Sequence, residues 1–395
     1  MDLNRNTKWL EDINFLCCEL PKKHKNLFAQ KSENEFLSDI SLLKTNVDSL
    51  NNHEIKLQIA KIIASIKDAH TTVPLQINLL LPLELYWFSD GIYVISAPLV
   101  YKDIVYCKIT KVNGTPIEEV ITILKSIISY ENGAYLNSQI PKYLPAIELL
   151  YDLELINDID SLNLTFEDEK GTIDCLEITS LPARECRETL QSIDNSLVSA
   201  EKLPLYRRNI DKCYWFQYIP IHKIIYFKYN ACRDMLHIDV FNFCENLMLF
   251  IKDHAVDTLI IDMRNNFGGI STLLDPFIED ISHCNRINKK GNLFVIVGRE
   301  TFSSALLNVF SLKQNTSAIF IGEPTGGKPN CYGEVQRFIL KNYGLTICYS
   351  TEYYKIIEDD TLPSFYPYVN ITLTIEDYFT NGDPCFEHII KYKDL

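Results

Sequence analysis

Three short apolar runs in the second half of the sequence constrain the fold more than any other feature. They are Thr258–Met263, Leu293–Gly298 and Ala318–Gly322, and two segments with helical spacing of apolar residues, 271–281 and 301–312, separate them. Nearly continuous apolar runs of this length are typical of strands buried on both faces of a parallel sheet. Because parallel neighbours are joined by right-handed crossovers, this region predicts an α/β fold with a parallel sheet and helices on its faces.

The turns that follow these strands are expected to lie together. They contain Gly268-Gly269, Thr301–Ser304 and Thr325–Lys328. The carboxyl ends of parallel strands meet at one edge of the sheet, where α/β folds form their ligand crevice. The sequence therefore predicts a functional site built from these three turns.

Ser303 is the candidate nucleophile of this site. It stands where a strand gives way to a helix, a position where serine is also a common helix N-cap. Amides at a helix N-terminus favour negative charge, so the Ser304 N–H can stabilise an oxyanion beside the Ser303 hydroxyl. Gly268 and Gly269 lack a Cβ, which lets a second backbone N–H approach the same point.

Lys328 is a candidate general base in the third turn. A lysine in a desolvated site can lose its proton, although most lysines stay solvated at the surface. The run Gly326-Gly327-Lys328 is not a phosphate-binding loop, because Pro329 stands where that motif has serine or threonine. The sequence also lacks G-x-S-x-G, H-E-x-x-H and the Cys/His spacings of metal sites, so we expect neither a cofactor nor a metal.

The first half of the sequence has a different character. Residues 1–68 carry apolar residues at helical spacing, and Gly91–Ala97 and Ile104–Val112 are rich in strand-forming residues. Asn113-Gly114 is a tight-turn pair, and Pro116–Ile128 has the start signals of a helix. This order of strand, turn and helix is that of the middle of a PDZ-like module.

These changes of character predict four regions. Residues 1–72 form a helical region, 73–181 a PDZ-like and β-rich module, 182–210 a polar connector, and 211–395 the parallel-sheet core.

Charge and cysteine usage exclude some classes of protein. The formal net charge is −14, which argues against sequence-independent binding to nucleic acid or to an anionic membrane surface. The twelve cysteines form no C-x-x-C pair, and the N-terminus lacks the pattern of a signal peptide. No apolar stretch is long enough to cross a bilayer. We therefore expect a cytoplasmic protein with free thiols.

Three motifs occur in order and together resemble the S41 serine peptidases. They are Ile260–Gly269, with the pattern D-x-R-x-N-x-G-G, the serine-rich turn Thr301–Ala305, and Gly322–Lys328, with the pattern G-E-x-T-x-G. The run Pro367–Pro384 is similar to the closing segment of this family. The resemblance covers roughly residues 60–395. It implies a ClpP/crotonase-like parallel-sheet core, preceded by a helical region and a small PDZ-like module.

The resemblance also implies roles for single residues. The nucleophile of the family falls on Ser303, and its oxyanion hole on the amides of Ser304 and of Gly268 or Gly269. The C-terminal-processing (tail-specific) branch uses a lysine as the base, which matches Lys328.

The tricorn-like branch uses a histidine instead, which matches His70 in Asp68-Ala69-His70-Thr71. We favour His70, because an imidazole accepts a proton near neutral pH with little adjustment of its pKa. An acid should orient His70, and the sequence leaves five candidates for it, namely Asp68, Glu352, Glu358, Asp359 and Asp360.

The predicted activity is therefore that of a serine peptidase acting on a peptide or protein. Two alternatives remain open, a non-catalytic ligand-binding protein with the same fold and a hydrolase of non-peptide esters or amides. The PDZ-like part suggests that a substrate C-terminus adds as a strand at Ile104–Ile109. The sequence does not indicate the oligomeric state.

Overall fold

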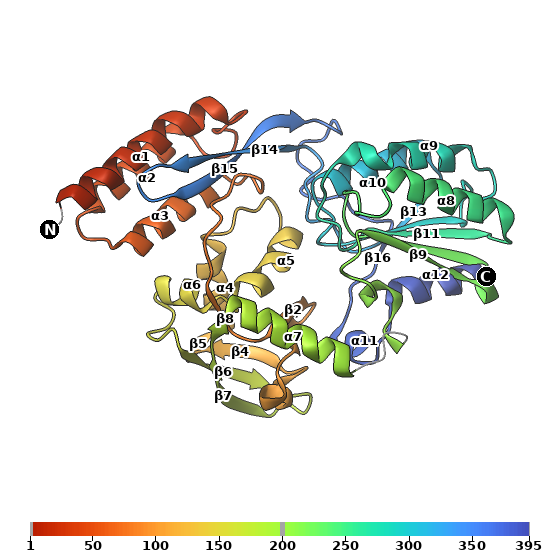
Figure 1. Ribbon diagram of the computed structural model, residues 1–395, viewed down its shortest axis with the longest axis horizontal. Coiled ribbons are helices and arrows are strands. Elements are labelled where there is room, and N and C mark those ends of the chain that lie inside the picture. Colours follow the sequence, from red (N-terminus) through yellow and green to blue (C-terminus); the bar gives the residue numbers. More distant parts are fainter. Residues whose placement is uncertain (1–2, 198–201, 395) are drawn as a thin grey trace.

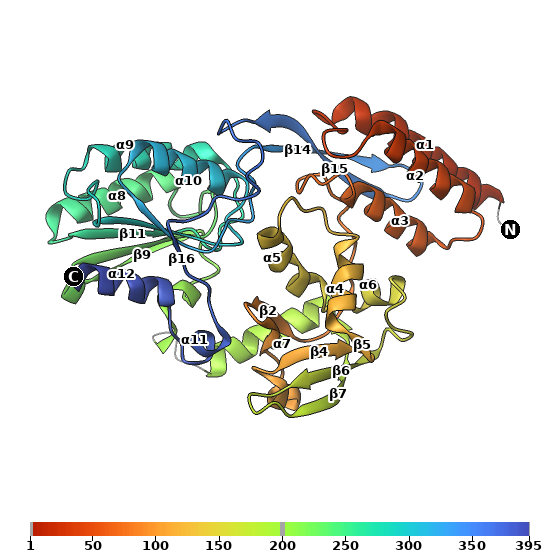
Figure 2. The ribbon, with the colours of Figure 1, turned by 180° about the vertical axis from the view of Figure 1, so that it is seen from behind.

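The computed structural model describes residues 3–197 and 202–394. Figures 1 and 2 show three parts, an N-terminal group of helices beside a long hairpin, an antiparallel sheet with helices, and a sheet covered by helices on both faces. The strand pairings form a six-stranded sheet in the third part and another in the second. The largest buried apolar clusters follow the same division, so each part has a core of its own.

The third part is built on a mainly parallel six-stranded sheet. Its strands lie in the order β16-β13-β12-β11-β10-β9, and all neighbours are parallel except β9 and β10. The bounds are β9 (Tyr214–Ile219), β10 (Ile224–Tyr229), β11 (Thr258–Asp262), β12 (Leu293–Val297), β13 (Ile319–Gly322) and β16 (Val369–Asn370). Every residue of β10, β11 and β12 is buried, which explains why these strands are mainly apolar, with Lys228 and Asp262 as their charged residues. The predicted α/β parallel-sheet core is confirmed.

Helices cover both faces of this sheet (Figure 1). On one face lie α8 (Val240–Asp253), α9 (Asp275–His283) and α10 (Ser304–Asn315), whose apolar sides pack with the sheet in one cluster. On the other face, α12 (Pro384–Asp394) inserts Cys385 and Ile389 against the strands. Helices thus cover both faces of the sheet, which leaves its edges and the ends of its strands as the places where a ligand can bind.

The first part combines both ends of the sequence. It contains α1 (Leu3–Lys23), α2 (Glu33–Asn46) and α3 (Asn52–Ala64), so helices form within residues 1–68 as expected. These helices pack on a hairpin of β14 (Cys331–Leu340) and β15 (Leu345–Tyr354). The ring of Trp9 stacks on Tyr343 at the hairpin turn, with 3.8 Å between centroids. The hairpin comes from the region predicted as 211–395, but its apolar side is buried against α1–α3.

The second part is an antiparallel sheet with the strand order β2-β3-β4-β6-β7. The bounds of its main elements are β2 (Glu84–Phe88), β3 (Gly91–Ser96), β4 (Lys108–Val112), β6 (Ser161–Glu167), β7 (Ile173–Thr179), α4 (Ile117–Lys125), α5 (Gly133–Tyr143) and α6 (Ile147–Asp152). Asn113 and Gly114 form the expected turn, with φ of 46° and 81°. That this part is PDZ-like stays a prediction.

The predicted strand addition at residues 104–109 finds no free edge along β4. This strand lies inside the sheet and pairs with β3 on one side and β6 on the other. Residues 106 and 107 also exchange backbone hydrogen bonds with Val94 of β3. The expectation of a peptide-binding edge there is wrong, because β4 is a central strand. A short apolar run does not show the order of strands in a sheet, so the sequence could not reveal which strands are central.

The predicted connector, residues 182–210, begins with helix α7 (Ala183–Leu197). Its residues 198–201 lie outside the described residues.

No helix in the described ranges is long and apolar enough to cross a membrane. Within the same ranges, no three His, Cys, Asp or Glu side chains are grouped as metal ligands. All twelve cysteines are free thiols.

Candidate active site

Ser303 has a strained backbone at the start of α10. Its φ is 54° and its ψ is −129°, a conformation that residues with a Cβ rarely adopt. The side chain makes no capping hydrogen bond to the helix, although it stands at the N-cap position. The alternative of a plain N-cap therefore does not describe this serine. Strain of this kind is stored where a site needs one particular side-chain direction.

His70 lies directly beside Ser303. The distance from His70 Nε2 to Ser303 Oγ is 3.0 Å, across 233 positions of sequence. The imidazole stacks on the ring of Phe302, with centroids 4.5 Å apart, which fixes its plane. Burial lowers the pKa of His70, and the charge of Asp68 partly opposes this shift. A neutral imidazole at this distance can accept the proton of the serine hydroxyl.

Asp68 is the acid nearest to His70 among the sequence candidates. Its Oδ1 accepts the backbone N–H of His70 at 2.9 Å and lies 4.0 Å from His70 Nδ1. That Nδ1 is buried and has no hydrogen-bond partner among the described residues. Catalytic hydrogen bonds are often long without substrate and shorten in the reacting complex. The carboxylate is thus placed to stabilise a positive charge on the ring.

Three further side chains hold the Asp68 carboxylate in place. Thr71 Oγ and Ser350 Oγ each donate to Oδ2 at 2.6 Å, and His24 Nε2 lies 3.0 Å from the same oxygen. Burial by itself would raise the pKa of Asp68, but these hydrogen bonds and the charge interaction with His70 together outweigh burial and lower its pKa to about 2. Asp68 therefore stays ionised at every pH at which a histidine base works.

The tautomer of His24 follows from its second nitrogen. The backbone N–H of Asn26 donates to His24 Nδ1 at 3.0 Å, so Nδ1 is an acceptor and carries no proton. Nε2 then carries the proton and donates it to Asp68. Sequence reasoning missed His24 and Ser350, which come from segments far from residue 68. Only Thr71, three residues from Asp68, carried a local signal.

Gly268 contacts the Ser303 turn so closely that no side chain fits. A Cβ on Gly268 would lie 2.8 Å from Ser303 Cβ and 2.9 Å from the Ser304 nitrogen, and its φ is +104°. The Gly268 N–H donates to Asn266 Oδ1 at 2.9 Å. By contrast, neither the Gly269 N–H nor the Ser304 N–H donates to another residue in the described ranges. These two amides are free to bind an oxyanion.

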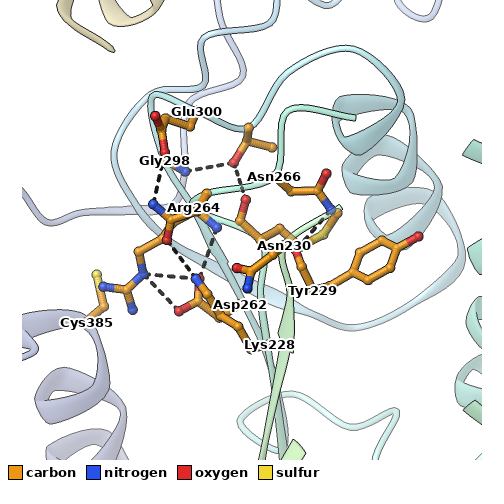
Figure 3. Close-up of polar contacts among 12 residues, drawn as sticks. Lys228, Tyr229, Asn230, Asp262, Arg264, Asn266, Gly298, Glu300 and Cys385 are labelled. Atoms are coloured by element: carbon orange, nitrogen blue, oxygen red, sulfur yellow. Dashed lines mark hydrogen bonds and ion pairs between the residues drawn. The ribbon is translucent and has the colours of Figure 1, made fainter. Parts of the chain in front are cut away.

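A buried ionic network braces the loop that carries these glycines (Figure 3). Arg264 donates two hydrogen bonds to Asp383, at 3.1 and 2.9 Å, and its backbone N–H donates to Asp262 at 3.0 Å. Lys228 Nζ lies 3.2 Å from the fully buried Asp262 carboxylate. Further along, Asn266 Nδ2 donates to the Tyr229 carbonyl at 3.0 Å. The loop is therefore fixed to β10 and to the start of α12.

Lys328, the other candidate base, has no direct contact of this kind among the described residues. It is half-buried and forms no hydrogen bond with Ser303 or His70 in the described parts of the chain. Its charge instead acts on Glu131, Cys331 and Asp360.

The four downstream acids are engaged elsewhere. Glu352 pairs with Lys25 at 3.1 Å and Glu358 with Lys355 at 2.7 Å. Asp359 accepts from Thr361, and Asp360 accepts from Asn330 and Tyr353.

A cleft of about 1170 Å³ lies between the second part and the sheet. Its walls include residues 83–86 of the second part, the loop residues 264–265, and residues 298–300, which end three positions before Ser303. Arg299 lines it, forms an ion pair with Glu323, and has its guanidinium 4.9 Å from the Tyr86 ring. The cleft thus borders the segment that leads to Ser303, at the carboxyl ends of the strands, where α/β folds bind ligands. Ser303 and His70 themselves are not among the residues that line it.

The comparisons with known proteins agree with this architecture. No protein-family model and no curated protein matches the sequence. Among solved structures, mature CPAF complexed with lactacystin superposes with a TM-score of 0.69 and 15% identity, covering 99% of this chain and 98% of that one. A CPAF s499a mutant superposes with a TM-score of 0.68 and 13% identity, covering 99% of this chain and 97% of that one. The tricorn protease superposes with a TM-score of 0.46 and 15% identity, covering 98% of this chain and 36% of that one. The chain shares the fold of CPAF over nearly its whole length, and the S41 peptidase fold that the motifs indicated fits this similarity.

Proposed function

We propose that the protein is a serine peptidase in which Ser303 is the nucleophile and His70 the general base. The 3.0 Å contact between His70 Nε2 and Ser303 Oγ carries this proposal. Two independent features support it, the strained φ of Ser303 and the close approach of Gly268 to the same turn. The sequence motifs and the fold of CPAF point the same way, and in this reading Lys328 is not the base.

The first half of the reaction forms an acyl-enzyme. Ser303 Oγ attacks the peptide carbonyl carbon while His70 Nε2 takes the hydroxyl proton, and Asp68 stabilises the imidazolium. The amides of Ser304 and Gly269 donate to the oxyanion, since that of Gly268 is already bound to Asn266. His70 then gives its proton to the leaving amine, and the C–N bond breaks.

The second half repeats these roles with water. His70 takes a proton from a water molecule, the hydroxide attacks the acyl carbonyl, and the same amides hold the second oxyanion. His70 returns the proton to Ser303 Oγ as the carboxylic acid leaves.

The size of the cleft favours a polypeptide over a small ester as the natural substrate. A volume of about 1170 Å³ exceeds the ~300–1,000 Å³ of ordinary small-molecule pockets. In this proposal an extended peptide of several residues lies in the cleft and continues past residues 298–300, which line it, to bring one carbonyl to Ser303. Recognition of a free C-terminus, as in the tail-specific branch, would then occur in this cleft and not at β4.

Hydrolysis of a mixture of unfolded proteins tests the proposal. The wild-type protein is expected to produce new termini that mass spectrometry detects, and Ser303→Ala to lower the rate by about 10⁶-fold, to background. Since the structure of CPAF contains lactacystin, we also expect that compound to block hydrolysis here. Cleavage by Ser303→Ala at the wild-type rate would contradict the proposal. Hydrolysis of small esters without any peptide cleavage would favour the alternative of a non-peptide hydrolase.

A further inference from the structure

The segment of residues 129–132 joins two loops of the candidate active site. Ser129 Oγ donates to the Thr71 carbonyl at 2.6 Å, one residue after His70. Asn132 Nδ2 donates to the Gly326 carbonyl at 2.9 Å, and its Oδ1 caps α5 by accepting the Tyr135 N–H at 2.8 Å. The segment therefore spans from the His70 loop to the turn that precedes Lys328.

Between these two anchors, Glu131 holds a carboxyl oxygen without a partner. Its Oε2 is buried and makes no hydrogen bond to the described residues. A buried carboxylate without a partner is costly, whereas a protonated carboxyl is tolerated in such a place. The ionisable groups that interact with Glu131 are Asp68, Lys328, Cys331, Tyr135 and Tyr332.

The pKa of Glu131 is raised to about 8, and burial is the largest cause. The negative charge of Asp68 also raises this pKa, and the positive charge of Lys328 opposes the shift. Lys328 is the one cation among the groups that interact with Glu131 in the described part of the chain.

We propose that Glu131 is a positioning residue which supports the His70 loop only while its buried carboxyl is protonated. This inference rests on the proposed serine-peptidase function. In the neutral state Glu131 does not repel the Asp68 carboxylate, and the Ser129–Thr71 hydrogen bond keeps the His70 loop in place. Ionisation puts a second negative charge near Asp68, on the segment whose Ser129 holds the Thr71 carbonyl, and thereby weakens the support of the His70 loop. The Lys328 side chain then sets the pH of the switch and is not the base.

The pH dependence of hydrolysis tests this role. For the wild-type protein, we expect kcat/KM to fall with a midpoint near pH 8, so that the ratio of its values at pH 9 and pH 7 is about 0.1 for a single titrating group. In Glu131→Gln, whose amide cannot ionise, this ratio is expected to approach 1. Lys328→Met removes the charge that lowers the pKa of Glu131, so its midpoint is expected to move to higher pH. An alkaline fall that is the same in wild type and Glu131→Gln would overturn the proposal.

Thermal unfolding supplies a readout that does not need activity. The folded pKa of Glu131 lies above its value of about 4.3 in an unfolded chain, so its contribution to stability is lost as pH rises from about 4.5 to 8. We therefore expect the Tm of Glu131→Gln minus that of wild type to grow between pH 5 and pH 8 and then to stay level. A constant difference over that range would show that Glu131 is not held protonated and would overturn the inference.

The two readouts separate the two proposals. If neither wild type nor Glu131→Gln hydrolyses peptides at any pH while the difference between their Tm values grows, the proposed serine-peptidase function is wrong, and the conclusion that Glu131 is held protonated remains. If hydrolysis is present and the Tm difference is constant, the function stands and the role of Glu131 fails. Should Glu131→Gln not fold, Lys328→Met carries the test, because its alkaline midpoint must rise if Glu131 titrates.

Discussion

At the scale of single residues, the site depends on which side chains are kept charged and which neutral. Asp68 receives three side-chain hydrogen bonds and stays ionised, whereas burial keeps His70 neutral. A neutral base beside a fixed carboxylate is the pairing that a serine nucleophile needs near neutral pH. The strain at Ser303 gives the hydroxyl its direction toward that base.

The pKa of His70 predicts the acid side of the pH profile. Because burial lowers this pKa from 6.5, activity should be lost as pH falls through a midpoint below 6.5. Asp68→Asn removes the charge that raises the pKa of His70, so the midpoint moves to still lower pH. Loss of an orienting acid also lowers the maximal rate of a serine–histidine pair by about 10⁴-fold. Rates of peptide hydrolysis between pH 4.5 and 8 measure both effects, and a wild-type midpoint above 6.5 would contradict them.

At the scale of elements, the turn that follows β11 is constrained by its contact with the turn of Ser303. Gly268→Ala places a Cβ 2.8 Å from Ser303 Cβ at a φ of +104°, so we expect loss of serine reactivity by at least about 10²-fold, as for removal of one oxyanion donor. Gly114→Ala is the matched control. Its φ is +81°, and a Cβ there meets nothing within 4 Å.

Gly268→Ala and Gly114→Ala should therefore both carry the strain of an alanine at positive φ, which is roughly 1–2 kcal/mol, and should differ in their rates of peptide hydrolysis. Urea unfolding and peptide hydrolysis measured together check this. Equal activity in the two variants would mean that the contact between Gly268 and Ser303 is unimportant.

Elements were also the scale at which the sequence was most informative. The apolar runs that form β11, β12 and β13 have almost the predicted bounds, because strands buried on both faces tolerate few polar residues. The predicted edge along residues 104–109 failed, because the neighbours of a strand depend on distant segments. His24 and Ser350 could not be predicted for the same reason, since only the folded chain brings them to Asp68.

At the scale of the whole molecule, the N-terminal helices and the hairpin of β14 and β15 depend on each other. The hairpin is a sheet of only two strands, which pair with each other, and its apolar side is covered by α1–α3. It also supplies Ser350, which donates to Asp68, so the helices support the site from a distance. This arrangement joins residues near both ends of the sequence.

Trp9→Ala tests that dependence. Trp9 is fully buried and stacks on Tyr343, so its truncation is expected to cost about 3–5 kcal/mol in the free energy of unfolding. Trp87→Ala, at a partly buried tryptophan in the second part, is the comparison and should cost less. Chemical denaturation followed by fluorescence measures both, and a smaller loss for Trp9→Ala would contradict the account.

The central claim, that His70 activates Ser303, is tested most directly by labelling with a fluorophosphonate probe and locating the adduct by peptide mapping. The account predicts one adduct on Ser303, lost in Ser303→Ala, slowed by a large factor in His70→Ala and changed little in Lys328→Ala at pH 7. An adduct that forms as fast in His70→Ala as in wild type, and fails to form in Lys328→Ala, would contradict the account and assign the base to Lys328.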